Sequence, residues 1–184
     1  MTQEWHIRDS RDPHKVFHPT TQAVLTLFPY LRKTHDFGQI LDMGCGSGLL
    51  SIAAADIWPQ SKILAADISE QAILDATHNV AVNAVERQIE VVRSEGYSHP
   101  MIAKNGPYNL IVSNLIAELH LRYAREVKEH LAPNGVAILA GLLAWLTPPV
   151  IELYEQMGFG LEQTVEANEW RILVMSAKSP QSAV

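Results

Sequence analysis

Apolar and polar residues along this chain follow two different periods, and segments of the two kinds alternate. Short apolar runs that end at turn residues predict buried strands, and they cover residues 39–43, 62–67, 89–92, 110–113 and 136–140. Apolar positions three or four residues apart predict helices, and these cover residues 20–31, 48–57, 70–83, 119–131 and about 149–158. Strands that alternate with helices predict a parallel sheet covered by helices on both faces.

Two more segments, at residues 161–165 and 170–175, are predicted as strands after the last predicted helix. Only a short turn separates them, so they predict a hairpin that adds antiparallel strands at one edge of the sheet. The expected fold class is therefore α/β, a mostly parallel seven-stranded sheet with an antiparallel C-terminal edge. With 184 residues, the chain has room for one domain, expected over residues 19–176. Residues 1–18 are expected to form an N-terminal arm and residues 177–184 a flexible tail.

The turn after the first predicted strand is rich in glycine. Asp42 ends the strand, and Gly44, Gly46 and Gly48 follow at alternate positions before an apolar helix begins. Glycine lets the backbone turn sharply and approach a ligand, and the free N–H groups of the next helix favour a negatively polarised group. The dinucleotide fingerprint G-x-G-x-x-G requires a glycine at position 49, where this chain has Leu49.

A second acidic residue, Asp67, ends the next predicted strand. Its distance past the glycines is close to the roughly 20 residues typical of an acid that binds ribose hydroxyls. Taken alone, the glycine turn could serve packing and Asp67 could cap a helix. Together, with a helix between them, they predict a site for one nucleoside.

Composition and charge exclude several other classes of function. The net charge of −6 argues against a large nucleic-acid partner but not against a basic protein segment. The single cysteine, Cys45, excludes an internal disulfide, and the scattered histidines predict no metal site. The chain has neither an apolar run of about 20 residues nor a signal-like start, so we expect a cytoplasmic protein without a membrane span.

Four stretches of the chain resemble one known family. The D-x-G-x-G-x-G pattern at 42–48 resembles motif I of class I S-adenosylmethionine (SAM) methyltransferases. H-P-T-T at 18–21, S-N-L-I-A at 113–117 and E-W-R-I at 169–172 are similar to segments of the PrmA-like enzymes, which methylate the stalk protein of the large ribosomal subunit.

Two features differ from that family. A separate N-terminal substrate-binding domain precedes the family's catalytic domain, whereas only about seventeen residues precede H-P-T-T here. The family also has a glycine-threonine run directly before its histidine, where this chain has Val16-Phe17.

The resemblance implies a Rossmann-like class I methyltransferase fold with SAM as the cofactor. It also implies a role for each candidate residue: the glycine turn lies against the methionine moiety and ribose, Asp67 binds the ribose, Ile68 packs on adenine, and Thr20 and Thr21 lie near the methionine carboxylate. The expected cofactor-binding residues are Thr20, Thr21, Asp42, Gly44, Cys45, Gly46, Ser47, Gly48, Asp67, Ile68, Ser94, Glu95 and Asn114.

Asn114 is also the candidate catalytic residue, because its amide oxygen could accept a hydrogen bond from the amine that receives the methyl group. An asparagine at a strand end is otherwise common, and threonines are common in a first helical turn. The expected reaction is methyl transfer to a nitrogen acceptor, a lysine amine of a protein with a basic segment. A small-molecule methyltransferase and a SAM-binding protein without catalysis are the alternatives.

Overall fold

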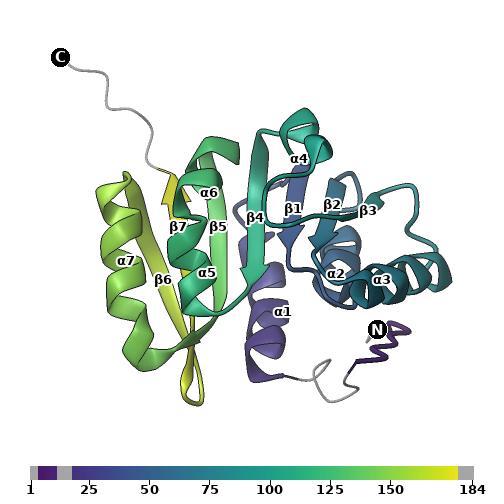
Figure 1. The fold of residues 1–184 in the computed structure, drawn as a ribbon, viewed down its shortest axis with the longest axis horizontal. Helices are drawn as coiled ribbons and strands as arrows, with labels where there is room; N and C mark the ends of the chain where they lie inside the picture. The colour runs from purple at the N-terminus through teal and green to yellow at the C-terminus, as the bar shows by residue number, and fades with distance from the viewer. Residues whose placement is uncertain (1–3, 12–17, 178–184) are drawn as a thin grey trace.

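A mixed sheet of seven strands forms the centre of the molecule in a computed structural model that describes residues 4–11 and 18–177. The strands are β1 Gln39–Met43, β2 Lys62–Asp67, β3 Ile89–Arg93, β4 Tyr108–Asn114, β5 Leu131–Leu143, β6 Phe159–Ala167 and β7 Trp170–Ala177. Their order is β3-β2-β1-β4-β5-β7-β6 (Figure 1). The pairs among β1 to β5 are parallel, and β7 runs antiparallel to both β5 and β6. This confirms the expected fold class and its antiparallel C-terminal edge.

Helices cover both faces of the sheet. They are α1 Pro19–Leu31, α2 Leu49–Ile57, α3 Glu70–Val82, α4 Pro100–Asn105, α5 Ala117–Arg122, α6 Ala124–His130 and α7 Thr147–Gln156. One apolar core joins α1, α2 and α3 to strand residues such as Ile40 and Leu110, and a second joins α4 to α7 to their neighbours Leu41 and Ile111. Successive strand side chains point to opposite faces, so a continuous apolar run supplies both cores.

The single helix expected at 119–131 is divided in the structure. The structure has two short helices that meet at Tyr123, and Leu131 already belongs to β5, where it pairs with Tyr108. The ring of Tyr123 lies 5.7 Å from that of Tyr97. The division at Tyr123 has no signal in helical periodicity, so the pattern of apolar residues predicted one continuous helix.

Strand β5 is longer than the expected 136–140. Its pairing with β4 is irregular between Leu131 and Val136, where Asn134 has a φ of 59°, and it continues past Gly141, whose φ is 81°.

The helix α4 was not predicted. It is one short element, begun by the ring of His99, whose Nδ1 accepts a hydrogen bond from the N–H of Met101 (3.2 Å).

Part of the expected N-terminal arm is described, and residues 4–11 run beside α3 (Figure 1). The N–H of His6 donates to Asn83, and the N–H of Arg8 donates to Asn79. The remainder of the expected arm, 1–3 and 12–17, and the expected tail from 178 onward lie outside the described residues.

A cluster of aromatic side chains in the core between the sheet and helices α1 and α2 holds these two helices together. Trp58, 1% exposed, makes ring contacts with Phe28 at 5.4 Å and Phe37 at 5.0 Å between centroids. Its indole N–H donates to the carbonyl of His35 (3.0 Å). Both the apolar area and the polar atom of this side chain are therefore satisfied inside the core.

Replacing Trp58 by alanine should lower the free energy of unfolding by about 3 to 5 kcal/mol, because it leaves a large cavity under α1 and α2. The matched control is Trp145→Ala, since Trp145 is 72% exposed and its loss should change stability by no more than about 0.5 kcal/mol. Urea denaturation followed by circular dichroism measures both. Equal effects of the two substitutions would contradict this account of the core.

Candidate functional site

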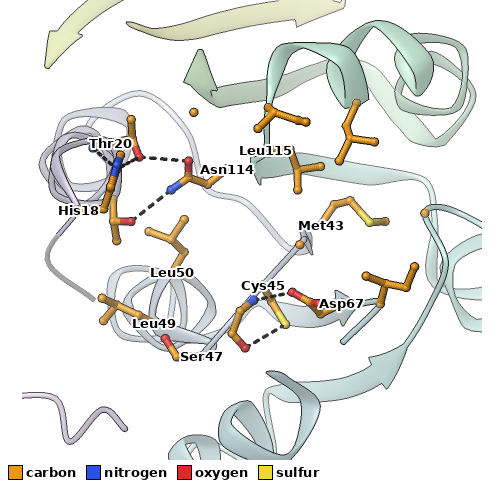
Figure 2. Close-up of a pocket in the computed structure, with 18 of the residues that line it drawn as sticks. His18, Thr20, Met43, Cys45, Ser47, Leu49, Leu50, Asp67, Asn114 and Leu115 are labelled. Atoms are coloured by element: carbon orange, nitrogen blue, oxygen red, sulfur yellow. Dashed lines mark hydrogen bonds between the residues drawn. The ribbon is translucent and has the colours of Figure 1, made fainter. Parts of the chain in front are cut away.

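A cavity of about 580 Å³ opens at the carboxyl ends of the parallel strands (Figure 2). Ligands of open α/β sheets bind at this end, and the volume lies within the range of ordinary small-molecule sites. The wall is formed by the turn after β1, the ends of β2, β3 and β4, the start of α1, and Trp170 at the start of β7.

The glycine turn follows β1 closely. The N–H groups of Gly44 and Cys45 both donate to the carbonyl of Ala66 on β2, at 2.7 and 3.0 Å. Gly44 has a φ of +75°, and a Cβ there would lie 2.5 Å from a methyl group of Leu115. The position favours glycine, because the positive φ would strain any other residue and a Cβ would force the side chain of Leu115 to move.

Asp67 faces this turn from the end of β2. Its Oδ2 accepts a hydrogen bond from the N–H of Gly46 (2.9 Å), and its Oδ1 accepts one from the N–H of Ser69 (2.8 Å), as Figure 2 shows for the first. Each carboxylate oxygen has a further lone pair that can accept from a ligand. The next residue, Ile68, is 59% exposed and offers an apolar surface at the cavity wall.

A polar cluster closes the opposite part of the cavity (Figure 2). The hydroxyl of Thr20 donates to Oδ1 of Asn114, and the Nδ2 of Asn114 donates to the hydroxyl of Thr21, both at 3.1 Å. His18 Nδ1 lies 2.8 Å from the Thr20 hydroxyl, and its ring meets that of Trp170 edge to face at 5.1 Å. Three stretches far apart in the sequence therefore meet at one place.

A glycine on β5 and a histidine on α5 support the position of Asn114. A Cβ on Gly141 would lie 2.5 Å from the carbonyl oxygen of Leu115 and 2.9 Å from Oδ1 of Asn114. Nε2 of His120 lies 2.9 Å from the carbonyl oxygen of Ala140. Burial lowers the pKa of His120 to about 4, so this ring is a neutral structural group at physiological pH.

Asp42 does not reach the cavity. It is 1% exposed, and the hydroxyl of Ser51 donates to its Oδ2 at 2.6 Å. Burial raises the pKa of Asp42 to about 7, and the nearby charge of Asp67 adds to the effect, while the bond from Ser51 opposes it. Asp42 therefore acts from behind the turn, joining β1 to α2.

Cys45 and Ser94 line the cavity without being chemically activated. Burial raises the pKa of the Cys45 thiol well above its ordinary value, so the sulfur stays protonated and unreactive. The hydroxyl of Ser94 donates to the carbonyl of Gly96 (2.6 Å) and accepts from the N–H of His99 (3.2 Å). Its role is to shape the loop after β3, on which Glu95 also lines the cavity.

The structure gathers nearly all of the residues expected to bind the cofactor around one cavity. The exceptions are Asp42, enclosed behind the turn, and Gly48, the last residue of the turn, where a Cβ would lie 3.2 Å from Ala76 of α3. The residues that line the cavity are Thr20, Thr21, Gly44, Cys45, Gly46, Ser47, Asp67, Ile68, Ser94, Glu95 and Asn114.

Several residues that line the cavity were not expected from the sequence, among them Asp9, Arg11, Tyr123 and Gly141. Asp9 and Arg11 lie in a segment without periodicity, and Gly141 lies in a strand. No local pattern could have assigned these three residues to the site.

A family model described as ribosomal protein L11 methyltransferase (PrmA) matches residues 17–178. Among the curated relatives, ribosomal protein L11 methyltransferase of Rhodopseudomonas palustris (strain BisB5) is 33% identical over 159 residues, which are 86% of this chain and 54% of the relative. The chain thus spans about half the length of the curated relatives it matches.

Two solved structures extend the comparison. The ribosomal protein L11 methylase of Lactobacillus delbrueckii subsp. bulgaricus has a TM-score of 0.78 at 27% identity, over 88% of this chain and 80% of that chain. An RNA methyltransferase of Salinibacter ruber, solved in complex with S-adenosyl-L-homocysteine, has a TM-score of 0.67 at 14% identity, over 91% of this chain and 98% of that one. At that identity, the second likeness concerns the fold alone.

Across the ranges 4–11 and 18–177, no helix has the length and apolar character needed to cross a membrane.

Asp42 should make the stability of the protein depend on pH. Between about pH 4 and pH 7 the unfolded chain ionises this carboxyl while the folded chain keeps it protonated, so stability falls as the pH rises. Asp42→Asn removes this titration and still accepts the bond from Ser51. The unfolding free energy of the variant relative to the unmodified protein should therefore rise by about 2 to 3 kcal/mol from pH ~5 to pH ~8. Urea titrations at both pH values measure this, and parallel pH profiles would contradict it.

Proposed function

Because the chain belongs to the ribosomal protein L11 methyltransferase (PrmA) family, we propose that it transfers a methyl group from SAM to a nitrogen atom of a protein, with a lysine amine as the acceptor. The enzyme class and the cofactor expected from the sequence are those of this family. One observation supports the proposal above all others. The segments that contain His18, Asn114 and Trp170 meet beside the glycine turn, in one cavity.

The residues that line the cavity fit the chemistry of SAM. Asp67 supplies a carboxylate for the two ribose hydroxyls, and exposed Ile68 supplies an apolar surface for adenine. The loop of Ser94 and Glu95 borders the same region, and the glycine turn leaves the backbone open to the sugar and the methionine moiety. Bound there, SAM would supply an electrophilic methyl group on its sulfonium.

The protein's main task is then to position the acceptor and to exclude water. Correct orientation of two reactants can contribute about 7 to 11 kcal/mol to a reaction of this kind, so no strong base is needed. Asn114 suits the positioning role. Its Oδ1 accepts one bond from Thr20 and has a second lone pair for an amine N–H.

A lysine acceptor must lose its proton before it can attack, although its ordinary pKa is about 10.4. An apolar surrounding lowers the pKa of an amine because it disfavours the charged form. Met43, Leu115 and Leu119 supply such a surface in the cavity wall. We therefore infer that the acceptor amine becomes neutral on entering the cavity.

The proposed partner is a protein with a basic segment. The net charge of −6 favours such a segment and disfavours a phosphate backbone. The proposed compartment of this chain is the cytoplasm, where a ribosomal protein would be available as a substrate.

Asn114→Ala should keep the affinity for S-adenosylhomocysteine within about threefold and lower the methylation rate about 100-fold, because the acceptor loses its orienting group. Calorimetry gives the affinity, and transfer of labelled methyl groups gives the rate. The matched control is Asn105→Ala at the end of α4, outside the cavity, which should leave both values unchanged. An unchanged rate in Asn114→Ala would refute its role.

Incubation with methyl-labelled SAM and purified ribosomal protein L11, followed by acid hydrolysis, should yield labelled methyl-lysine. A cell lysate treated in the same way and separated by size provides the comparison. Label that appears only among small molecules would favour a small-molecule methyltransferase. Cofactor binding without transfer to either fraction would favour a non-catalytic SAM-binding protein.

A further inference from the structure

The described N-terminal segment, residues 4–11, forms a strap that is fixed to α3 by a buried carboxylate. Asp75 accepts hydrogen bonds from the N–H of Ser10 (2.9 Å), from its hydroxyl (2.7 Å) and from Nε of Arg8 (3.1 Å). Burial alone would raise the pKa of Asp75, but these bonds outweigh it and lower the pKa. The strap therefore has a defined path over the end of the sheet.

One side chain joins the strap to the glycine turn. Nδ2 of Asn79 donates to the carbonyl of Arg8 (2.7 Å) and to the carbonyl of Ser47 (2.8 Å). Both N–H groups of this buried amide are used, one on each segment. The position of the strap and the position of the turn are thus set by the same residue of α3.

At the end of the strap, Arg11 enters the cavity wall beside the turn. Its Nε and Nη2 bind the two carboxylate oxygens of Asp9 at 3.1 and 2.9 Å. Nη2 also lies 3.0 Å from the point where a Cβ on Gly46 would stand. Both Asp9 and Arg11 line the cavity together with Asp67.

The charges of SAM indicate what this guanidinium would bind. SAM carries a sulfonium, an ammonium and one anionic group, its carboxylate, and an arginine attracts only the last of these. In the described contacts, Asp9 accepts from two of the five N–H donors of the Arg11 guanidinium. The carboxylate of a ligand can accept two parallel hydrogen bonds from the remaining donors. The other arginine that lines the cavity, Arg122, lies over the ring of Tyr123 instead.

The threonines expected near the methionine carboxylate cannot satisfy it alone. Thr20 is fully buried and its hydroxyl proton goes to Asn114, so only the hydroxyl of Thr21 can donate a proton. A carboxylate with one neutral donor is poorly satisfied in a partly buried site. Free N–H groups at the start of α2, where Leu49 and Leu50 line the cavity, can add neutral donors, but a guanidinium would also compensate the charge of the carboxylate.

We propose that Arg11 is a cofactor-binding residue that holds the carboxylate of the methionyl group of SAM, with Asp9 as the residue that positions its guanidinium. The inference rests on the proposed function, because it takes SAM as the ligand. The strap lies outside residues 17–178, the part of the chain that the family model matches. It is thus a feature of this chain rather than of the matched domain.

The test compares two ligands, S-adenosylhomocysteine and 5′-methylthioadenosine, which share the adenosyl group but differ in the carboxylate. Calorimetry on the full chain should show that Arg11→Gln weakens S-adenosylhomocysteine about 10- to 100-fold and leaves 5′-methylthioadenosine unchanged. Arg125→Gln removes the same charge from α6, outside the cavity and away from the strap, and should change neither affinity. Asp67→Ala should weaken both ligands, because both contain the ribose.

Two results would overturn the proposal. If Arg11→Gln binds S-adenosylhomocysteine as tightly as the unmodified protein does, the guanidinium does not hold the carboxylate. If it loses both ligands equally, its role is structural. Failure of the proposed function would look different, since the unmodified chain would then bind neither ligand or would bind them without transferring a methyl group.

Discussion

The rest of the site depends on one contact, the hydrogen bond from the N–H of Gly46 to the carboxylate of Asp67. It exists because β1 and β2 are parallel neighbours in register, with Met43 beside Ala66, so both strands end at the same level. The turn after β1 must then pass over the end of β2, and only a chain of small residues can do so at this distance. The same contact aims Asp67 at the cavity.

The two carboxylates at the ends of these neighbouring strands have separate tasks. Asp42, enclosed behind the turn, favours its neutral form and bonds to Ser51 on α2. Asp67, at the cavity, accepts two backbone N–H groups and keeps capacity for a ligand. Burial favours the neutral form of Asp42 below about pH 7, which lessens the repulsion between two carboxylates at adjacent strand ends.

Much of this arrangement could be predicted from the sequence. The strand and helix periods predicted the α/β class, and α3 begins at residue 70 as expected, where the hydroxyl of Ser69 accepts a bond from the N–H of Ala72. The division at Tyr123, where one expected helix is two, has no signal in the spacing of apolar residues. The roles of Asp67, Ile68 and Asn114 toward SAM stay predictions.

Other residues of the site have no signal in the local sequence pattern. Arg11 reaches the cavity only because Asp75 and Asn79, on a helix more than sixty residues away, hold the strap that carries it. Gly141 matters because the chain after β4 passes within contact distance of it. Residues of this kind become visible only when the packing of distant segments is known.

The polar cluster at Asn114 shows how such distant packing can serve chemistry. A free asparagine amide would turn about its last side-chain bond, but here Thr20 and Thr21 of α1 fix its oxygen and its nitrogen in place. The close approach of Gly141 fixes the backbone from the other side. An amide held in this way keeps one lone pair in a constant direction, and constant direction is what transfer between two positioned groups requires. The site therefore favours a reaction governed by orientation over one governed by a strong acid or base.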